Sequence, residues 1–553
     1  MAGESASGAL HCVAEADGPA SQAVIAAADP HAVDAGHAML ARGGSAIDAA
    51  IAAVLALGVV EPAETGIGGG GFLLYRDGET GEMAVYDGRE TAPAAAGPDR
   101  FLLPGGLAMP KALAIASGRA SGVPGLLALL ELAHREQGRL AWPVLFEPAI
   151  RLAAEGIPTP PRLTDQVRGD PSLDLFSGTR RLFAPVDDGA DRWKNAQLAE
   201  TLRMIAEQGP RAVYEGAVAK DIVAAVRERS IYPGDMTRSD LADYRSVRRQ
   251  PVCGEYRQWR ICGAPPPSSG GIAVLQSLKL LERFDMASLG PESAKAVHLI
   301  AEASRLAYAD RARHIGDPAF VDVPVRGLTD PDYLAARSSL ISPRRAMARA
   351  PAGAPPMIVA PAAVGGPSAG GGDTSHLSVL DCAGNAVALT SSIEAPFGNR
   401  MAVRGVLLNN QLTDFAFRPA RNGHPAANRV AAGKRPMSAM SPTIVTGPEG
   451  RVRLVIGARG GPRIIGYVVR TLIAVLDWRR PLEQALALPN FVHTGGDAIE
   501  MEPALADSDI LEDLEAMGHD IDIETLTSGL HGVERIGAQL RGAADPRMDG
   551  AAR

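Results

Sequence analysis

The sequence has few of the features that mark disulfide frameworks, metal sites or membrane spans. Only four of its 553 residues are cysteine, with no CxxC pair and no repeated spacing: Cys12, Cys253, Cys262 and Cys382. This usage is typical of ordinary thiols in a reducing compartment and speaks against a disulfide framework or a structural zinc site. The longest apolar run, residues 49–60, is too short to cross a bilayer, so it predicts a buried helix.

A basic excess and an N-terminal apolar segment are also lacking. The net charge of −8 and a pI near 5.8 speak against nucleic acid and anionic membranes as partners and favour small molecules. The first twenty residues carry Glu4, Glu15 and Asp17 but no h-region, so we expect no secretory signal and a cytoplasmic protein. A periplasmic location would follow only from a misassigned start. The eleven histidines form no HExxH motif and no compact cluster, so we expect neither a metal nor another cofactor.

Helix and strand patterns predict an α/β layered protein, with helices covering the outer faces of sheets. Two helices are expected over residues 34–42 and 46–57, with Gly43-Gly44 between them and Ser45 as N-cap of the second. Residues 72–76 and 83–86 predict a hairpin around the turn 77–81. Residues 120–345 predict mainly helices, one of them over 294–313. Strands return at 375–380, 386–392, 405–408 and 452–456, before a helix over 464–478.

Residues 350–372 differ from the rest of the chain because they are rich in Pro, Ala and Gly and carry no charge. This composition predicts a mobile loop. The loop meets an alternating strand at Asp373-Thr374. If that peptide bond were cut, Thr374 would hold both a hydroxyl nucleophile and an amine that can deprotonate it. Taken alone, a threonine here is more often an ordinary β-branched strand residue than a nucleophile.

Eight ordered motifs between about Pro30 and Gly550 give the sequence a resemblance to γ-glutamyltransferases. They are Gly58-Val59-Val60-Glu61-Pro62, Gly66-Ile67-Gly68-Gly69-Gly70-Gly71-Phe72, Asp87-Gly88-Arg89-Glu90, Pro265-Pro266-Pro267-Ser268-Ser269-Gly270-Gly271, Asp373-Thr374-Ser375-His376, Leu408-Asn409-Asn410-Gln411, Lys434-Arg435-Pro436-Met437-Ser438 and Asp545-Pro546-Arg547.

The resemblance implies an N-terminal-nucleophile hydrolase, an α/β protein built as an αββα four-layer sandwich. It also implies a precursor that cuts itself between Asp373 and Thr374. Residues 30–373 would form a large subunit and residues 374–553 a small subunit carrying the nucleophile, and the two would stay together as a heterodimer. Residues 1–29 are expected to be a disordered N-terminal extension.

The catalytic roles follow residue by residue from the same resemblance. Thr374 would attack the carbonyl of Asp373, and later the substrate, with its freed amine as general base. Gly460 and Gly461 follow a predicted strand and would donate backbone N–H groups to the oxyanion, although such a pair is also common turn chemistry. Ser392 matches a family threonine whose hydroxyl supports the nucleophile.

A γ-glutamyl donor carries an α-carboxylate and an α-ammonium, and the resemblance assigns residues to both. Arg89 would hold the carboxylate through its planar guanidinium, with a hydroxyl from Ser438. Asp414 would pair with the ammonium, with Gln411 as a further acceptor and Glu394 at a position where the family has asparagine. Two further departures are Ala439 in place of a second serine and a shorter segment over 415–434, which suggests an open cleft.

These residues predict a self-processing γ-glutamyl transferase or hydrolase that acts on glutathione-like amides through a γ-glutamyl-Thr374 ester, with water or an amino acid as acceptor. One alternative is a cephalosporin- or glutaryl-acylase-like amidase of the same superfamily. Its acyl group has no ammonium, so Asp414 and Glu394 would face it unpaired. Another is a non-catalytic scaffold in which Glu394 and Ala439 have disabled donor binding.

Two further signals favour structure over chemistry. Gly66 to Gly71 satisfy the GxGxxG pattern, but a helix precedes them and a strand follows, which is the reverse of a dinucleotide site. His376 shares a strand face with Thr374 and either tunes the site or is a hydrogen-bonded structural residue.

Overall fold

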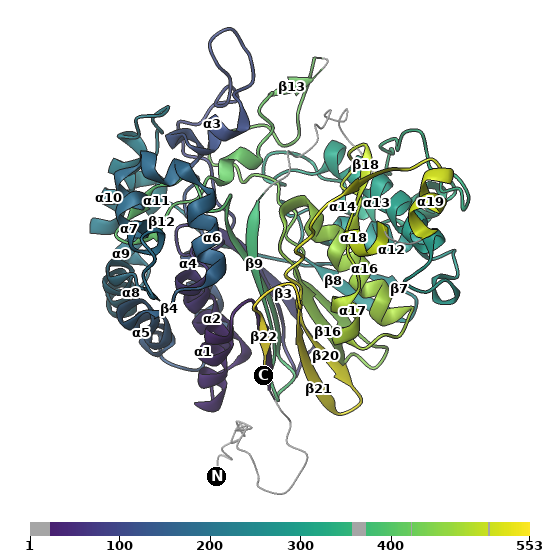
Figure 1. The fold of residues 1–553 in the computed structure, drawn as a ribbon, viewed down its shortest axis with the longest axis horizontal. Helices are drawn as coiled ribbons and strands as arrows, with labels where there is room; N and C mark the ends of the chain where they lie inside the picture. The colour runs from purple at the N-terminus through teal and green to yellow at the C-terminus, as the bar shows by residue number, and fades with distance from the viewer. Residues whose placement is uncertain (1–22, 357–371, 422, 507–508) are drawn as a thin grey trace, which may run out of the picture.

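Two antiparallel sheets pack face to face in the middle of the molecule (Figure 1). The computed structural model describes residues 23–356, 372–421, 423–506 and 509–553. The first sheet has the strand order β22-β1-β9-β10-β2-β3-β6 and the second β21-β20-β16-β15-β8-β7. The strands of the first are β1 (Val24–Ala27), β2 (Gly70–Arg76), β3 (Met83–Asp87), β6 (Val247–Arg249), β9 (Asp373–Leu380), β10 (Ala386–Glu394) and β22 (Ala551–Ala552). Those of the second are β7 (Val252–Tyr256), β8 (Trp259–Gly263), β15 (Thr443–Thr446), β16 (Val452–Gly457), β20 (His531–Ile536) and β21 (Gln539–Ala544).

Side-chain alternation decides which layer each strand residue meets. In β2, Phe72 and Leu74 belong to the core between the two sheets, where Ile444 of the second sheet also lies. Leu73 and Tyr75 belong instead to the core under the outer helices. Both faces of the central strands are therefore buried.

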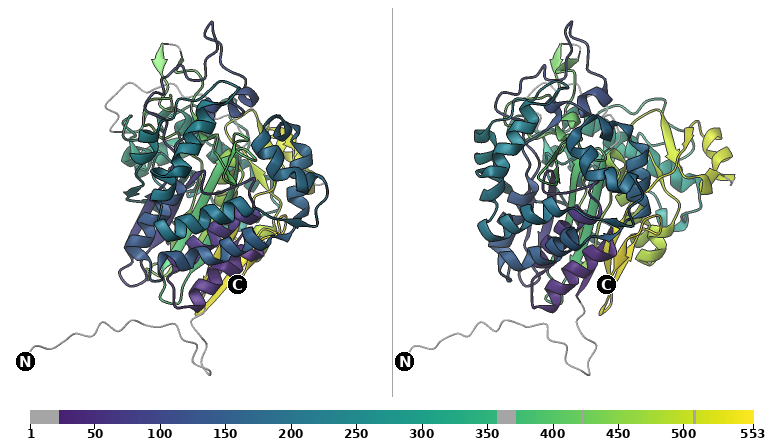
Figure 2. Two further views of the ribbon diagram at one scale, coloured as in Figure 1. Left: turned by 90° about the vertical axis from the view of Figure 1, so that its left-hand side faces the viewer. Right: turned by 60° about the vertical axis from the view of Figure 1, so that its left-hand side comes forward.

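Helices cover the outer face of each sheet. Those against the first sheet include α1 (Pro30–Ala41), α2 (Ala46–Val60) and α4 (Leu126–Gln137), and α5 (Glu147–Glu155) and α8 (Ala196–Gln208) pack outside them in the same core. Those against the second include α12 (Gly270–Leu281), α16 (Ile464–Leu476) and α17 (Leu482–Ala487), and α13 (Ala294–His314) packs on α12. The turned views in Figure 2 show the N-terminal helices in front of the strands that they cover. The predicted αββα sandwich is confirmed.

Shorter elements complete the described chain. The helices are α3 (Lys111–Ile115), α6 (Pro161–Gly169), α7 (Ser177–Asp187), α9 (Arg211–Tyr214), α10 (Ala217–Arg227), α11 (Arg238–Ala242), α14 (Val325–Leu328), α15 (Pro331–Ser338), α18 (Pro503–Ala506) and α19 (Asp509–Ala516). The strands are β4 (Ile157–Pro158), β5 (Arg192–Trp193), β11 (Ala402–Val403), β12 (Val406–Leu407), β13 (Ala420–Arg421), β14 (His424–Pro425), β17 (Phe491–Val492), β18 (Ala498–Met501) and β19 (Asp520–Ile523).

Local sequence signals predicted several of these elements correctly. Ser45 caps α2 in a capping box, since its hydroxyl accepts from the Asp48 N–H while the Asp48 carboxylate accepts from the Ser45 N–H. The predicted hairpin is the antiparallel pair β2 and β3. It ends at Asp87, so Arg89 follows a strand end as expected.

The expected N-terminal extension over residues 1–29 is wrong for its last part. Residues 24–27 form β1, which pairs with the nucleophile strand β9 on one side and with β22 on the other. Asp29 caps α1 by accepting from the His31 N–H at 2.7 Å. This segment of four apolar residues is too short to show an alternating strand pattern by itself. Hydrogen bonds to the neighbouring strands fix its extended conformation. Residues 1–22 lie outside the described part of the chain.

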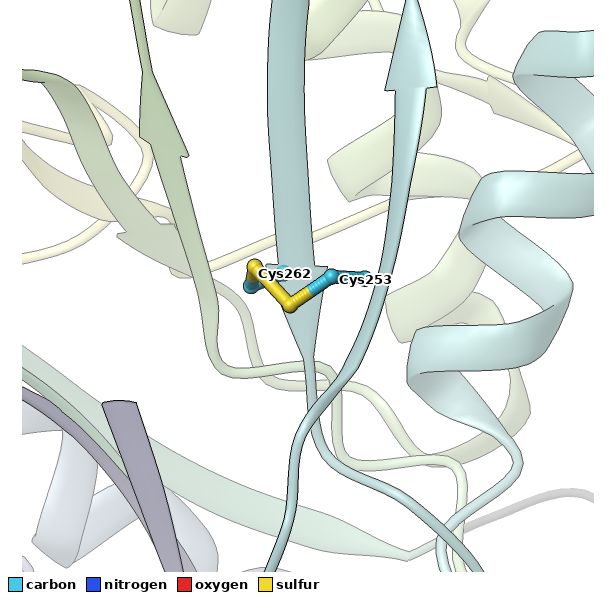
Figure 3. The surroundings of a disulfide bond; sticks show 2 residues. All are labelled: Cys253 and Cys262. Atoms are coloured by element: carbon cyan, nitrogen blue, oxygen red, sulfur yellow. A yellow bond between two sulfur atoms is a disulfide. The ribbon is translucent and has the colours of Figure 1, made fainter. Parts of the chain in front are cut away.

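The mainly helical prediction for residues 120–345 missed five strands, β4 to β8. They include the pair that carries Cys253 and Cys262, which lie directly opposite each other and form a disulfide (Figure 3). The expectation of ordinary thiols is therefore wrong, and no cysteine in the described residues is free. A search for CxxC spacing could not find this pair, because a hairpin turn at Arg257 and strand register bring the two residues together. Since disulfides are typical of oxidising compartments, cysteine usage no longer supports a cytoplasmic location.

The predicted loop over residues 350–372 falls mostly outside the described residues, because 357–371 are not described. Residues 350–356 form no helix or strand. The strand that follows begins at Asp373, two residues earlier than predicted.

Candidate active site

Thr374 is the second residue of β9, a central strand of the first sheet, and its side chain is buried. Beside it, β10 carries Ser392 and Glu394, and Glu394 pairs with Asp373 across a register shift between Ser391 and Glu394. Glu394 has φ +79, a left-handed conformation that non-glycine residues rarely adopt. This irregularity of β10 places the ends of both strands at one pocket.

The Ser392 hydroxyl donates to the carbonyl oxygen of Asp373 at 2.5 Å. The Ser392 oxygen in turn accepts from the Glu394 N–H at 2.8 Å, which orients the hydroxyl hydrogen toward that carbonyl. A hydrogen bond to a carbonyl oxygen polarises it and stabilises the charge that develops when the carbon is attacked. In the continuous chain the Ser392 hydroxyl therefore contacts the peptide group that precedes Thr374.

Eight of the ten residues predicted for the site line one pocket. They are Thr374, Ser392, Arg89, Glu394, Gln411, Asp414, Ser438 and Gly461. Asp373 and Gly460 are chain neighbours of two of them but do not line it. The pocket also contains residues that sequence reasoning did not assign: Arg311, Gly372, Met437, Ala439, Met440, Pro462 and Ile464.

Arg89 is almost fully buried, and backbone carbonyls fix its guanidinium. Its Nε and NH2 groups donate to the carbonyls of Pro436 and Met437 at 3.2 and 3.0 Å, and NH2 also donates to Asp414 Oδ2 at 2.5 Å. The neighbouring Glu90 carboxylate lies 3.7 Å from NH1. Burial raises the pKa of Glu90 to about 8, so this acid is mostly neutral near pH 7 and does not cancel the arginine charge.

Acceptor groups gather opposite Arg89. Asp414 Oδ2 accepts from Gln411 Nε2 at 2.8 Å, while the buried Gln411 Oε1 has no hydrogen-bond partner in the described structure. Glu394 is buried, bonds to Asn410 Nδ2 and lies 3.6 Å from the Lys111 ammonium. Burial, reinforced by the Asp414 charge, raises the pKa of Glu394 to about 7.

Donor groups complete the other side of the pocket. The Ser438 oxygen accepts from the Met440 N–H at 3.1 Å, and its own hydrogen has no acceptor among the described residues. The Ser269 hydroxyl donates to the Ser438 carbonyl at 2.6 Å and accepts from Arg311 Nε at 2.7 Å. This chain of bonds holds Arg311, which comes from α13, beside Ser438.

Arg311 is the residue that sequence reasoning missed most clearly. Its side chain is buried, and its terminal NH1 and NH2 groups make no hydrogen bond or ion pair with a described residue. Ala439 supplies no hydroxyl in the same pocket. The guanidinium therefore offers donors where the resemblance expected a second serine. Its only sequence signal is an arginine within an amphipathic helix, which is far more often a solvated residue.

Gly460 and Gly461 lie in a turn between β16 and α16, both with positive φ, at 112° and 58°. A Cβ atom on Gly461 would lie 3.1 Å from the nitrogen of Gly372, so a side chain would crowd the segment before the nucleophile. Neither glycine N–H donates to a described acceptor. Both N–H groups are therefore without a partner among the described residues, and Gly461 lines the pocket, as an oxyanion site requires.

His376 is a structural residue and does not line the pocket. Its ring bonds to Thr390 Oγ1 at 2.8 Å and to Ser378 Oγ at 3.0 Å, and it packs on Gly457 of the second sheet. Burial holds the pKa of His376 well below its usual range, so the ring is neutral.

No described residue of the segment 415–434 lines the pocket. The segment contacts the site through Asn428, which donates to the Asp414 carbonyl at 2.7 Å. Within the described ranges no three His, Cys, Asp or Glu side chains gather as a metal site would need. No described helix combines the length and apolarity needed to span a bilayer.

The αββα fold, with a threonine at the start of a central strand and a polarised carbonyl before it, defines an amidase of the N-terminal-nucleophile class. A family model described as Gamma-glutamyltranspeptidase matches residues 32–553. The chain is 36% identical over 544 residues to the glutathione hydrolase proenzyme of Bacillus subtilis (strain 168), which covers 96% of this chain and 91% of that protein. It is also 36% identical over 547 residues to the glutathione hydrolase proenzyme of Escherichia coli (strain K12), with coverages of 96% and 91%.

Among solved structures, a cephalosporin acylase from Bacillus halodurans superposes with a TM-score of 0.82 at 26% identity, covering 96% of this chain and 95% of that one. Both the similarity to this acylase and the family match extend over nearly the whole chain. The chain belongs to the gamma-glutamyltranspeptidase family and is an enzyme.

Proposed function

We propose that this enzyme cuts its own chain between Asp373 and Thr374 and then transfers γ-glutamyl groups from glutathione-like amides to water or amino acids. The observation that carries the donor assignment is the buried, unpartnered Gln411 Oε1 beside Asp414. A buried acceptor without a donor costs free energy unless a ligand supplies one, and a ligand ammonium does so. The donors of Arg89, Ser438 and Arg311 suit the carboxylate of the same amino acid.

The self-cleavage step uses groups already in contact. The Thr374 oxygen attacks the carbonyl carbon of Asp373, and Ser392 stabilises the oxyanion. The C–N bond then breaks, the amine takes the hydroxyl proton, and Asp373 is left as an ester on Thr374. Water hydrolyses the ester, giving a free carboxyl group on Asp373 and a threonine with a free amine and hydroxyl. Residues 1–373 and 374–553 remain associated because strands of the two fragments pair within each sheet: β1 pairs with β9 in the first sheet, and β8 pairs with β15 in the second.

In turnover the freed amine acts as general base toward its own hydroxyl, because the pKa of an α-amine lies close to neutrality. The hydroxyl oxygen attacks the γ-carbonyl of the donor, whose oxyanion is stabilised by the N–H groups of Gly460 and Gly461. The amine of the donor leaves with the proton, and water or an amino acid then takes the acyl group from Thr374.

A glutaryl acylase is the second candidate, and similarity to a cephalosporin acylase favours it. A glutaryl group carries the carboxylate but not the ammonium. Gln411 Oε1 would then remain without a partner, at a cost of about 1–3 kcal/mol for an unsatisfied buried polar group, and Asp414 would keep only Arg89 and Gln411 as partners. The acceptors therefore favour an amino-acid donor.

The test combines a denaturing gel with two matched substrates. We expect fragments ending at 373 and beginning at 374 in the purified protein, and one uncut chain in Thr374→Ala. The cut enzyme should release the amine from a γ-glutamyl anilide much faster than from a glutaryl anilide. Release from the glutaryl compound alone would reject the donor assignment, and an uncut but active wild type would reject the nucleophile.

A further inference from the structure

A charged cluster lies beside the peptide bond that is to be cut, on the carboxylate of Asp373. The Arg459 guanidinium contacts this carboxylate and also donates to Glu64 Oε2 at 2.9 Å. Arg162 donates to the other Glu64 oxygen at 2.5 Å, and its NH2 group lies 3.6 Å from Asp373 Oδ2. The side chains of Arg459 and Glu64 are only 4% and 2% exposed. Such burial makes their charges sensitive to the loss of any partner.

Arg459 is fixed by the body of the protein, independently of Asp373. Its backbone N–H donates to the Ser528 carbonyl at 2.9 Å, and its side-chain stem packs against Gly529. Glu64, between α2 and β2, is held further by Gln166 Nε2 at 2.7 Å. The cluster therefore forms a fixed carboxylate site, and Asp373 is its occupant.

The same residue thus has both ends anchored. The Asp373 side chain is bound by Arg459, while its carbonyl oxygen accepts from Ser392 at 2.5 Å. Fixing the two ends leaves the carbonyl carbon little freedom to move away from the Thr374 hydroxyl. Holding reacting groups in one geometry is worth several orders of magnitude in an intramolecular reaction.

We propose that Arg459, supported by Glu64 and Arg162, is a positioning residue for self-cleavage that recognises the carboxylate of the residue before the nucleophile. The inference rests on the proposed function, because it concerns the same cut. Arg459 moves no proton and forms no bond to the reacting atoms. It acts through Asp373, whose carbonyl it holds against Ser392.

The charged residues around Arg459 balance one another. Glu64 and Asp373 balance the two arginines, and Glu61 at the end of α2 lies 3.7 Å from Arg162 NH1. Burial raises the pKa of Glu61. Neutralising Asp373 would leave Arg459 with Glu64 as its main charged partner.

The experiment measures the rate at which uncut chain converts into two fragments for the wild type, Asp373→Asn, Arg459→Gln and the double variant. We expect each single change to slow conversion at least tenfold. The double variant should be no slower than the slower single variant, because one contact is removed in all three. Arg459→Lys, which keeps the charge, should recover part of the rate. Arg463→Gln is the matched control, since it removes a partly exposed arginine on the same turn whose partner is Glu500.

The outcomes separate this inference from the proposed function. A wild type that never converts overturns the proposed function itself. If the wild type converts and the single variants convert at the same rate, the positioning role of Arg459 is overturned and the proposed function is not. The same holds if the effects of the two single changes multiply in the double variant. If Arg459→Gln fails to fold, which melting in a Thr374→Ala background detects, Asp373→Asn decides, because its side chain is 18% exposed and the change is isosteric. Full-rate conversion of that variant rejects the proposal.

Discussion

Replacing Asp414 by asparagine tests whether the acceptor side of the pocket selects an amino-acid donor. The change keeps the shape and one acceptor oxygen for Arg89 and Gln411 but removes the negative charge that we assign to the donor ammonium. The variant should therefore bind the transition state of γ-glutamyl transfer less well.

The size of the effect follows from burial. Removing one partner of a buried ion pair costs about 3–5 kcal/mol. The Asp414 side chain is 21% exposed, so water screens the ion pair and lowers that cost. We therefore expect the variant to lose about 2–3 kcal/mol of transition-state binding. Because each 1.36 kcal/mol is a factor of ten, kcat/KM should fall roughly 30- to 150-fold.

The assay compares γ-glutamyl and glutaryl anilides on the cut enzyme. Asp414 also holds Arg89, and both acyl groups carry the carboxylate that Arg89 would bind. If the loss reflects the ammonium, it appears only with the γ-glutamyl compound, and the ratio of the two kcat/KM values falls. An equal loss on both compounds would mean that Asp414 only positions Arg89, and would refute the donor assignment.

Three further predictions follow from the same structure. Since the pKa of Glu394 is raised to about 7, KM for γ-glutamyl donors should increase as pH falls below 7, and Glu394→Gln should flatten that profile. The effect of pH on stability is opposite to its effect on donor binding: because the folded-state pKa of Glu394 is raised, stability is lost as pH rises through 7. Glu394→Gln should therefore have a higher melting temperature than the wild type at pH 8, and a lower one would contradict this. Arg311→Met should raise KM at least tenfold for both γ-glutamyl and glutaryl anilides but leave an anilide with an uncharged acyl chain unchanged, whereas equal effects on all three would assign Arg311 a structural role only. Cys253→Ser should lower the free energy of unfolding by about 2–3 kcal/mol, the value for a loop of this length, in denaturant titrations without reductant. Reductant should destabilise the wild type more than the variant, and equal sensitivity would argue against the disulfide.

Local patterns predicted those elements whose signal lies within a few residues. Ser45 caps its helix through Asp48 three positions later, and the β2–β3 hairpin shows its alternation and turn directly. β1 and the strands β4 to β8 escaped prediction because short strands are stabilised by hydrogen bonds to partners far away in sequence. The Cys253–Cys262 disulfide escaped for the same reason, since it depends on strand register.

The residues of the candidate site likewise fall into those that the sequence predicted and those that only the structure showed. The resemblance identified Thr374, Arg89 and Asp414, and the structure brings them to one pocket. Motifs gave no sign of Arg311 or Arg459, because their contacts join α13 to Ser269 and the turn after β16 to Asp373. Such contacts arise only when the two layers pack.

By itself the sequence determined the chemistry available to this protein. It supplies a threonine at which the chain can be cut, cationic side chains to bind a donor carboxylate and acidic side chains to bind a donor ammonium. Those are properties of side-chain type and order along the chain. The tertiary structure alone decided which of these groups meet and in what charge state. Burial raises the pKa of Glu394 to about 7 and leaves Gln411 Oε1 without a partner, and a long-range contact binds Asp373 to Arg459.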